Sequence, residues 1–260
     1  MSTLEIQRPT PHTAEVWLNR PEVRNAFNDG VIAELTRAFR ELGADPNLRC
    51  ITLAGRGKAF CAGADLNWMK AMAGYDWEGN RADAQALADM LYTIYSCPIP
   101  VVGRIHGDCY AGGVGLAAVC DVLVAAQGVQ FCLSEARLGL LPATIGPYVV
   151  KALGEQASRR YFITAERFSS DEAHRLGFVH ECVPAEALDA RVQTMVEALV
   201  NNGPAAVKAC KRLVQDLSGQ PLSDELRADT ARRIADIRVS DEGKAGIRSF
   251  LEKSPAPWLS

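Results

Sequence analysis

Short apolar runs alternate with amphipathic stretches over the first 140 residues of this chain. The apolar runs predict strands over residues 14–20, 48–57, 98–107, 121–126 and 129–135. The stretches between them predict helices over residues 25–42, 62–72, 82–97 and 112–120. In the first of these helices, apolar residues recur at helical spacing on one face: Ile32, Leu35, Phe39 and Leu42. Strands that alternate with helices in this way indicate an α/β architecture.

Helical patterns dominate from about residue 147 onward. One of them carries apolar residues at helical spacing: Leu188, Val192, Met195 and Leu199. Pro204 and Pro221 divide the following segment into successive helices. We therefore expect a core domain over residues 1–200 and a C-terminal helical region over residues 201–260.

The composition is that of an ordinary globular protein, with 48% apolar and 23% charged residues. A net charge of −3 gives no reason to expect a nucleic-acid partner. No apolar run is long enough for a membrane span, and the first ten residues lack the features of a secretory signal, so we expect a cytoplasmic location. The eight cysteines and four histidines show no metal-ligand spacing, so we expect buried structural thiols and no metal site.

The sequence "AGGVGLAAVCD" (111–121) fits a dinucleotide-binding fingerprint in part. Gly113, Gly115 and Ala118 follow G-x-G-x-x-A after a predicted strand, and Glu135 comes about twenty residues later. However, only about nine residues separate the glycines from the next strand, whereas a parallel crossover needs a dozen or more. This spacing argues against NAD binding.

A different interpretation pairs this stretch with "GKAFCAGADL" (57–66). Both are predicted strand–turn–helix junctions with small residues at the turn, and amides at a helix start point outward without partners. Two such junctions side by side would aim two amides at one oxygen, as in an oxyanion hole. The alternative is that the glycines only permit tight turns and close packing of the helices.

Five stretches resemble the enoyl-CoA hydratase/isomerase (crotonase) family in order and spacing. They are "NRPEVRNAFN", "GKAFCAGADL", "IHGDCYAGGVGLAAVCD", "FCLSEARLGLLPA" and the C-terminal "GIRSFLEKSPAPW". The resemblance covers essentially the whole chain. It implies a crotonase-like ββα spiral core and a C-terminal helical trimerisation region, with assembly as a homotrimer or a dimer of trimers.

The resemblance also implies an acyl-CoA thioester as substrate. No separate cofactor is implied, because coenzyme A is part of that substrate. The thioester oxygen would accept hydrogen bonds from the amides of Ala64 and Gly112, with Gly113 serving the turn. The residues implied in CoA binding are Val23, Arg24, Ala26, Ala62, Asp65, Leu66 and Trp258. Trp258 would pack near the adenine of a neighbouring subunit.

The catalytic carboxylates depart from the family pattern. Hydratases of the family carry two glutamates: Glu135 matches the second, but Gly115 stands at the position of the first. The family's glycine-rich "PGGGGTQ" is also replaced by "PATIGPY" (142–148). Tyr148, Thr144 and Asp108 are candidates by proximity in sequence for a group that replaces the missing glutamate.

One carboxylate supports more than one activity. It could serve a hydratase by both taking and returning protons, or a Δ3-Δ2-enoyl-CoA isomerase by moving one proton between two carbons. A CoA-binding protein without catalysis is a further alternative. The stretches "CLSEARLGLLPATIGPYVVKALGE" and "RRYFITAERF" resemble bacterial methylglutaconyl-CoA hydratases, whose substrates carry a second carboxylate. Arg24 and Arg137 are possible partners for it, and we favour the hydratase.

Overall fold

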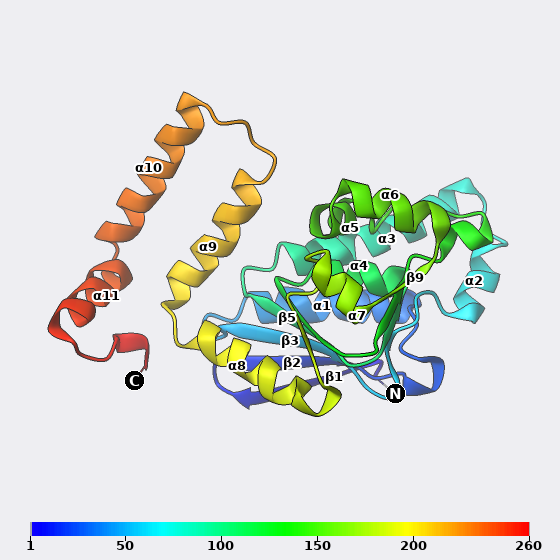
Figure 1. Ribbon diagram of the computed structural model, residues 1–260, viewed down its shortest axis with the longest axis horizontal. Helices are drawn as coiled ribbons and strands as arrows, with labels where there is room; N and C mark the ends of the chain where they lie inside the picture. The colour runs from blue at the N-terminus through cyan, green and yellow to red at the C-terminus, as the bar shows by residue number, and fades with distance from the viewer. Residues whose placement is uncertain (1, 260) are drawn as a thin grey trace. The chain divides into compact units, whose positions relative to one another are not determined.

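A computed structural model describes residues 2–259 of the chain. Contacts within the chain divide it into two compact units: one that ends at Val196 and one that begins at Glu197. The first unit contains the strands together with the helices packed on them. The second consists of the C-terminal helices (Figure 1).

The strands form two sheets in the first unit. The larger is a six-stranded sheet in the order β1 (Leu4–Thr10), β2 (Thr13–Leu18), β3 (Cys50–Gly55), β5 (Val101–Ile105), β7 (Val122–Ala126) and β10 (Glu181–Val183). The smaller is a four-stranded sheet in the order β4 (Ala59–Cys61), β6 (Asp108–Tyr110), β8 (Gln130–Cys132) and β9 (Arg167–Ser169). β1 and β9 pair antiparallel with their neighbours, and the remaining ladders are parallel.

Helices connect and cover these strands. In order along the chain they are η1 (Pro21–Val23), α1 (Asp29–Gly43), α2 (Leu66–Met72), α3 (Trp77–Tyr95), α4 (Gly112–Ala118), η2 (Glu135–Leu138), α5 (Gly146–Leu153), α6 (Glu155–Thr164), α7 (Ser170–Arg175), η3 (Ala185–Ala187) and α8 (Leu188–Val200). They are followed by α9 (Pro204–Leu217), α10 (Asp224–Val239), α11 (Asp241–Glu252) and η4 (Pro257–Leu259). Pro204 begins α9, as expected of a residue that tolerates only the first helical turn.

The order of the elements confirms the ββα spiral. Three times, a strand of the larger sheet is followed by a strand of the smaller sheet and then by a helix: β3-β4-α2, β5-β6-α4 and β7-β8-η2. This order also argues against the dinucleotide interpretation. The strand before the glycines is β6 of the smaller sheet, whereas the strand after them, β7, pairs with β5 in the larger sheet.

The same topology brings three junctions to one edge. β4 pairs parallel with β6, and β6 pairs parallel with β8, so their carboxyl ends meet. Ala64 follows β4, Gly112 follows β6 and Glu135 follows β8. Ligand sites in parallel sheets form where the chain leaves the carboxyl ends of adjacent strands.

Several predicted elements need correction. The strand predicted over 98–107 is shorter, and the separate strand β6 begins three residues after it ends. The segment after residue 147 contains β9 and β10 in addition to its helices. β1 was not predicted, because it is an edge strand in which Leu4 alone is buried and no apolar face marks it.

The core is built as the patterns predict. Ile32, Leu35, Phe39 and Leu42 of α1 are all buried. Five cysteines are buried among apolar side chains, as expected of structural thiols: Cys50, Cys61, Cys97, Cys109 and Cys132. Cys120 and Cys182 are half-buried and Cys210 is exposed on α9, which corrects that expectation for three thiols.

Candidate active site

Ala64 lies in an extended segment that runs beside Phe27. The Phe27 amide donates to the Gly63 carbonyl at 2.6 Å, and the Asp65 amide donates to the Phe27 carbonyl at 2.7 Å. The Ala64 amide between them donates to no acceptor among the described residues. Asp65 is the N-cap of α2, so the free amide belongs to the segment before the helix and not, as the sequence suggested, to the helix itself.

Gly112 begins α4 directly after a sharp turn. The turn residue is Ala111, whose φ of 48° is unusual for a residue with a side chain and costs about 1–3 kcal/mol. The Ala111 amide donates to the Cys132 carbonyl at 2.8 Å, whereas the Gly112 amide donates to no acceptor within residues 2–259. Gly113, which we expected to serve the turn, instead lies against β4: a Cβ there would be 2.5 Å from the Cys61 carbonyl oxygen.

The two turns are in contact with each other. A Cβ on Gly63 would lie 2.9 Å from the Cβ of Ala111 and 3.1 Å from the Tyr110 carbonyl oxygen. The ring of Phe27, whose backbone pairs with Ala64, would lie 3.0 Å from a Cβ on Gly112. The segments that carry the two free amides therefore pack against each other.

Glu135 begins η2 at the end of the third junction. Its Oε2 is buried and has no hydrogen-bond partner among the described residues. Burial raises the pKa of the Glu135 carboxyl above its ordinary value of 4.5, because the charged form loses hydration. The short helix is fastened nearby by Arg137, whose guanidinium donates to the Ala165 carbonyl at 2.6 Å. A carboxyl with a raised pKa and one unbonded oxygen is suited to exchange protons with a bound substrate.

Two of the candidates for a group that replaces the missing glutamate, Asp108 and Tyr148, have other contacts. Asp108 accepts hydrogen bonds from the Tyr110 hydroxyl at 2.6 Å and the Gln130 amide at 3.3 Å. Tyr148 packs against Tyr95, with ring centroids 5.3 Å apart, and burial raises the pKa of its hydroxyl. Neither set of contacts involves Glu135.

Two of the segments implied in CoA binding lie side by side. The Ala62 amide donates to the Arg24 carbonyl at 3.0 Å, and Arg20 donates to the Ala26 carbonyl at 2.8 Å. Arg20 also forms an ion pair with Asp65 at 2.8 Å. Burial raises the pKa of Asp65, but hydrogen bonds from the Asn67 amide and Arg20 outweigh it and hold the pKa below its usual value.

The exposed side chains of these segments are available to a ligand. Val23, Arg24 and Leu66 are exposed, and Leu66 keeps 74% of its surface. Trp258, the remaining residue implied in CoA binding, belongs to the C-terminal unit. Its indole N–H donates to the Asn201 carbonyl at 3.1 Å, and its ring would lie 2.8 Å from a Cβ on Gly246.

Sequence reasoning missed the residue that organises the first segment. Asn25 is 2% exposed and has a φ of 56°. Its side chain accepts from the Arg20 amide at 2.9 Å and donates to the carbonyls of Arg56 and Ala59 at 2.8 and 2.9 Å. In the sequence, Asn25 follows the charged Arg24 and precedes the apolar Ala26 and Phe27, a pattern that does not predict burial of its side chain. Only its place in "NRPEVRNAFN" marks it.

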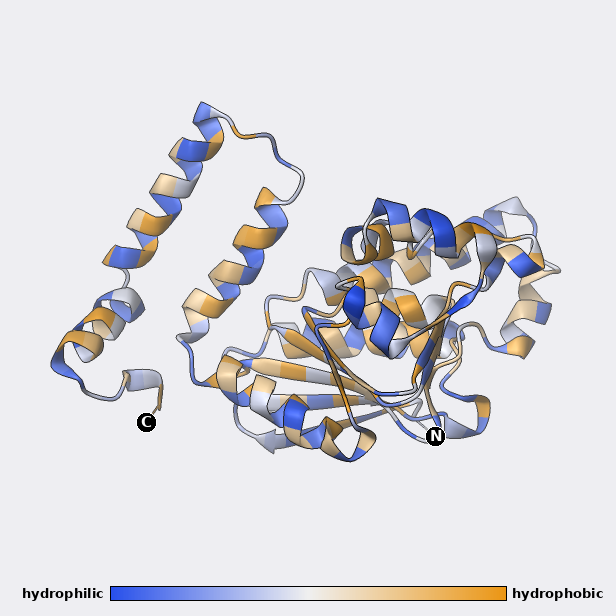
Figure 2. Cartoon of the chain, in the orientation of Figure 1, coloured by the Kyte–Doolittle hydropathy of each residue, from blue (hydrophilic) through white to orange (hydrophobic). Residues whose placement is uncertain are grey.

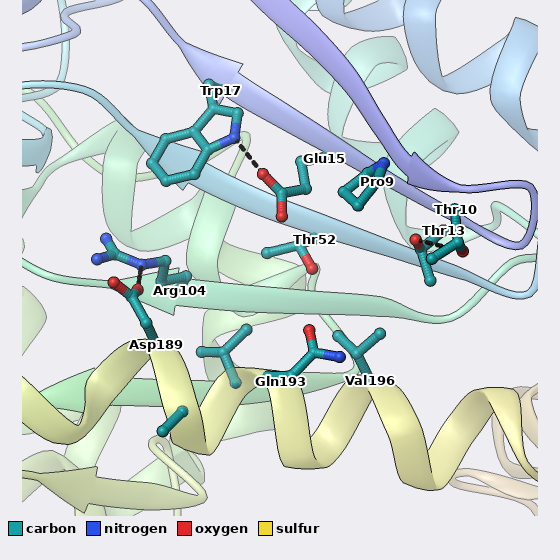
Figure 3. Close-up of a pocket in the computed structure, with 12 residues that line it drawn as sticks. Pro9, Thr10, Thr13, Glu15, Trp17, Thr52, Arg104, Asp189, Gln193 and Val196 are labelled. Atoms are coloured by element: carbon teal, nitrogen blue, oxygen red, sulfur yellow. Dashed lines mark hydrogen bonds and ion pairs between the residues drawn. The ribbon is translucent and has the colours of Figure 1, made fainter.

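A cavity of about 520 Å³ lies elsewhere in the first unit, between the larger sheet and α8 (Figure 3). None of its lining residues belongs to the three junctions. Some of its polar groups bond to one another: Arg104 pairs with Asp189 at 2.5 Å, and the Trp17 indole donates to Glu15 at 2.8 Å. The three junctions, which hold two unbonded amides and an unbonded carboxyl oxygen, make the stronger candidate site.

Other kinds of site have no support within residues 2–259. No group of three or more His, Cys, Asp or Glu side chains there could hold a metal ion. No helix in the same range is long and apolar enough to cross a membrane.

Comparisons with known proteins identify the family of the chain. The profile of the family described as Enoyl-CoA hydratase/isomerase matches residues 11–260. The enoyl-CoA hydratase ACTT6 of Alternaria alternata is 35% identical over 242 residues, which cover 92% of this chain and 78% of that protein. The crystal structure of an enoyl-CoA hydratase from Shewanella pealeana is 36% identical, with a TM-score of 0.95 over 98% of this chain and 96% of that one. An enoyl-CoA hydratase from Mycobacterium smegmatis is 32% identical, with a TM-score of 0.94 over 100% of both chains. The chain therefore belongs to the enoyl-CoA hydratase/isomerase family.

Proposed function

We propose that the protein is an enoyl-CoA hydratase, which adds water across the double bond of a 2-enoyl-CoA thioester. The observation that carries the proposal is the meeting of three groups at one edge of the smaller sheet. These groups are the free amides of Ala64 and Gly112 and the half-buried carboxyl of Glu135, whose buried Oε2 is unbonded. The names of the relatives support the same activity.

In the proposed mechanism, the two amides hold the thioester oxygen. They stabilise the negative charge that develops on it when a nucleophile adds to the β-carbon, and each such donor is worth about 3–4 kcal/mol in the transition state. The Glu135 carboxylate takes one proton from water as the hydroxyl oxygen bonds to the β-carbon. The protonated carboxyl then gives a proton to the α-carbon, so both parts of the water molecule enter the product and Glu135 is regenerated.

A Δ3-Δ2-enoyl-CoA isomerase is the second candidate. It is favoured by Gly115, because a single carboxylate is sufficient to move a proton from the α-carbon of a 3-enoyl thioester to its γ-carbon. The same amides would stabilise the enolate between the two transfers. Both activities therefore use the same three groups, and the substrate that is turned over distinguishes them.

We further propose 3-methylglutaconyl-CoA as the substrate. Support comes from the resemblance of "CLSEARLGLLPATIGPYVVKALGE" to the hydratases that act on it. Its second carboxylate needs a cation, and Arg24 and Arg137 are the candidates. Arg24 is exposed beside the Ala62 segment, and Arg137 stands two residues after Glu135. CoA would run past Val23, Arg24 and Ala26, with its adenine beside Ala62, Asp65 and Leu66.

We also propose that residues 201–260 form the trimerisation region, and that Trp258 packs near the adenine bound by a neighbouring subunit. The support is that none of the residues of α9 or α10, all of them described, is buried. Apolar and polar residues alternate along these helices (Figure 2). Large apolar side chains are left exposed: Val214, Leu222, Val239, Phe250 and Leu251. Sedimentation analysis tests the proposal, which a purely monomeric protein would contradict.

Three thioesters test the activity. Crotonyl-CoA, 3-methylglutaconyl-CoA and a 3-enoyl-CoA are each incubated with the protein, and the absorbance of the conjugated thioester is followed. Loss of absorbance with the first two identifies a hydratase, and a higher kcat/KM with the second identifies the substrate. A gain of absorbance with the third alone identifies the isomerase. If the absorbance changes with none of the three thioesters, the remaining interpretation is a CoA-binding protein without catalysis.

A further inference from the structure

The side chain of Ile145 occupies the space beside Gly115. A Cβ added to Gly115 would lie 2.1 Å from Ile145 Cγ2 and 2.5 Å from Ile145 Cβ. Non-bonded carbon atoms prefer about 3.5–4.0 Å. Both residues are buried, and Ile145 is 2% exposed. No side chain of any kind fits at position 115 while Ile145 keeps this position.

The backbone of Ile145 is fixed, so the overlap cannot be relieved by a small shift. Ile145 is the N-cap of α5, and its carbonyl accepts hydrogen bonds from the amides of Tyr148 and Val149, both at 3.1 Å. Pro147 further restricts this first turn. The β-branched side chain of Ile145 also has little rotational freedom.

The place of this contact in the site gives it a chemical consequence. Gly115 lies one helical turn after Gly112, so positions 112 and 115 share a face of α4. A carboxylate at position 115 would therefore extend from the helix one turn after the residue that carries the free amide. Ile145 closes that route, and an apolar side chain stands where a second acid would begin.

We propose that Ile145 is a specificity-determining residue that restricts the site to the single carboxylate of Glu135. This inference rests on the proposed function of the same site. On this account, Gly115 and Ile145 depend on each other: Gly115 has no side chain, and Ile145 fills the space that such a side chain would need. An acid at position 115 therefore also requires glycine at position 145. Alanine there would keep a Cβ 2.5 Å from the Cβ of residue 115, whereas the Cα of residue 145 lies 3.5 Å from it.

Thermal unfolding tests the contact without any assay of activity. In the natural background, G115A should lower Tm by about 2–10 °C through overpacking. The matched control is G146A, also in a helix, whose added Cβ would meet only Phe162 at 3.9 Å and should leave Tm unchanged or raise it. The loss caused by G115A should shrink in the I145A background and disappear in the I145G background. An equal loss in all three backgrounds, or no loss in any, overturns the proposal.

Activity tests the consequence for specificity. G115E alone should lose at least tenfold in every acyl-CoA conversion. G115E/I145G should raise the ratio of crotonyl-CoA hydration to 3-enoyl-CoA isomerisation at least tenfold above that of I145G. G115D/I145G carries the acid on a shorter side chain and takes its place if the glutamate variant does not fold.

Two outcomes separate this proposal from the proposed function. If G115E alone is as stable as the natural protein and changes the ratio, or if the double variants leave the ratio unchanged, Ile145 does not determine specificity, although the single-glutamate enzyme stands. If the natural protein converts no thioester, the proposed function fails. The specificity role fails with it, while the Tm series still decides whether Ile145 excludes a side chain at position 115.

Discussion

Replacing Glu135 with glutamine should remove activity and leave the fold intact. Glutamine has the same shape as glutamate, and the Glu135 Oε2 has no partner within residues 2–259 that would be lost. General acid–base catalysis contributes about 10²–10⁴ in rate, so kcat should fall by that factor. The corresponding rise in the barrier is about 2.7–5.4 kcal/mol. Acyl-CoA binding should survive, because the amides of Ala64 and Gly112 are unchanged.

The same substitution should stabilise the protein at high pH. Because burial raises the pKa of Glu135, the native state binds more protons than the unfolded state between the ordinary value of 4.5 and the raised value. Stability therefore falls as pH rises through that window. E135Q lacks the ionisation, so its Tm should exceed that of the natural protein at pH 8, and the difference should shrink on lowering the pH to about 4.

Calorimetry at the two pH values and turnover of crotonyl-CoA measure both effects. E186Q is the matched control: Glu186 is exposed in η3, and its replacement should alter neither turnover nor the pH dependence of Tm. Turnover of E135Q within threefold of the natural protein would refute the role of Glu135 in proton transfer. A lower Tm for E135Q at pH 8 would refute the argument from burial.

Three further changes probe the rest of the site. D65A should lower the free energy of unfolding, measured in urea titrations, by about 3 kcal/mol. It removes the N-cap of α2 and leaves Arg20, whose side chain is 18% exposed, without its ion pair. A loss below about 1 kcal/mol contradicts this reasoning. R24A should raise KM for crotonyl-CoA but not for crotonyl-pantetheine, which lacks the nucleotide; equal effects on both contradict a contact with the nucleotide. An ester in place of the amide at Ala64 should lower kcat about 10²–10³-fold, and an unchanged kcat would exclude Ala64 as an oxyanion donor.

Long periodic elements were predictable from the sequence, and very short ones were not. The helix over α1 was predicted because its apolar residues repeat over several turns, and all four of them are buried. The strands β6, β9 and β10 have three residues each, too few for a periodic pattern to emerge. Their pairing depends on the layout of the whole spiral, which the family resemblance gave and local patterns could not.

Part of the candidate site was predictable from the sequence, and part was not. Ala64, Gly112 and Glu135 were identified by motif, and the parallel order of β4, β6 and β8 explains why they share one edge. The contact between Gly115 and Ile145 joins residues about thirty positions apart and depends on how α4 packs on α5, so no local pattern predicts it. The sequence showed only that a glutamate was missing.

The most direct test is a crystal structure of E135Q with bound crotonyl-CoA. The account predicts the thioester oxygen at about 2.7–3.1 Å from both amide nitrogens, of Ala64 and Gly112, with the substituted side chain at position 135 beside the α- and β-carbons. A thioester oxygen bonded to neither amide, or an acyl group remote from position 135, would contradict it.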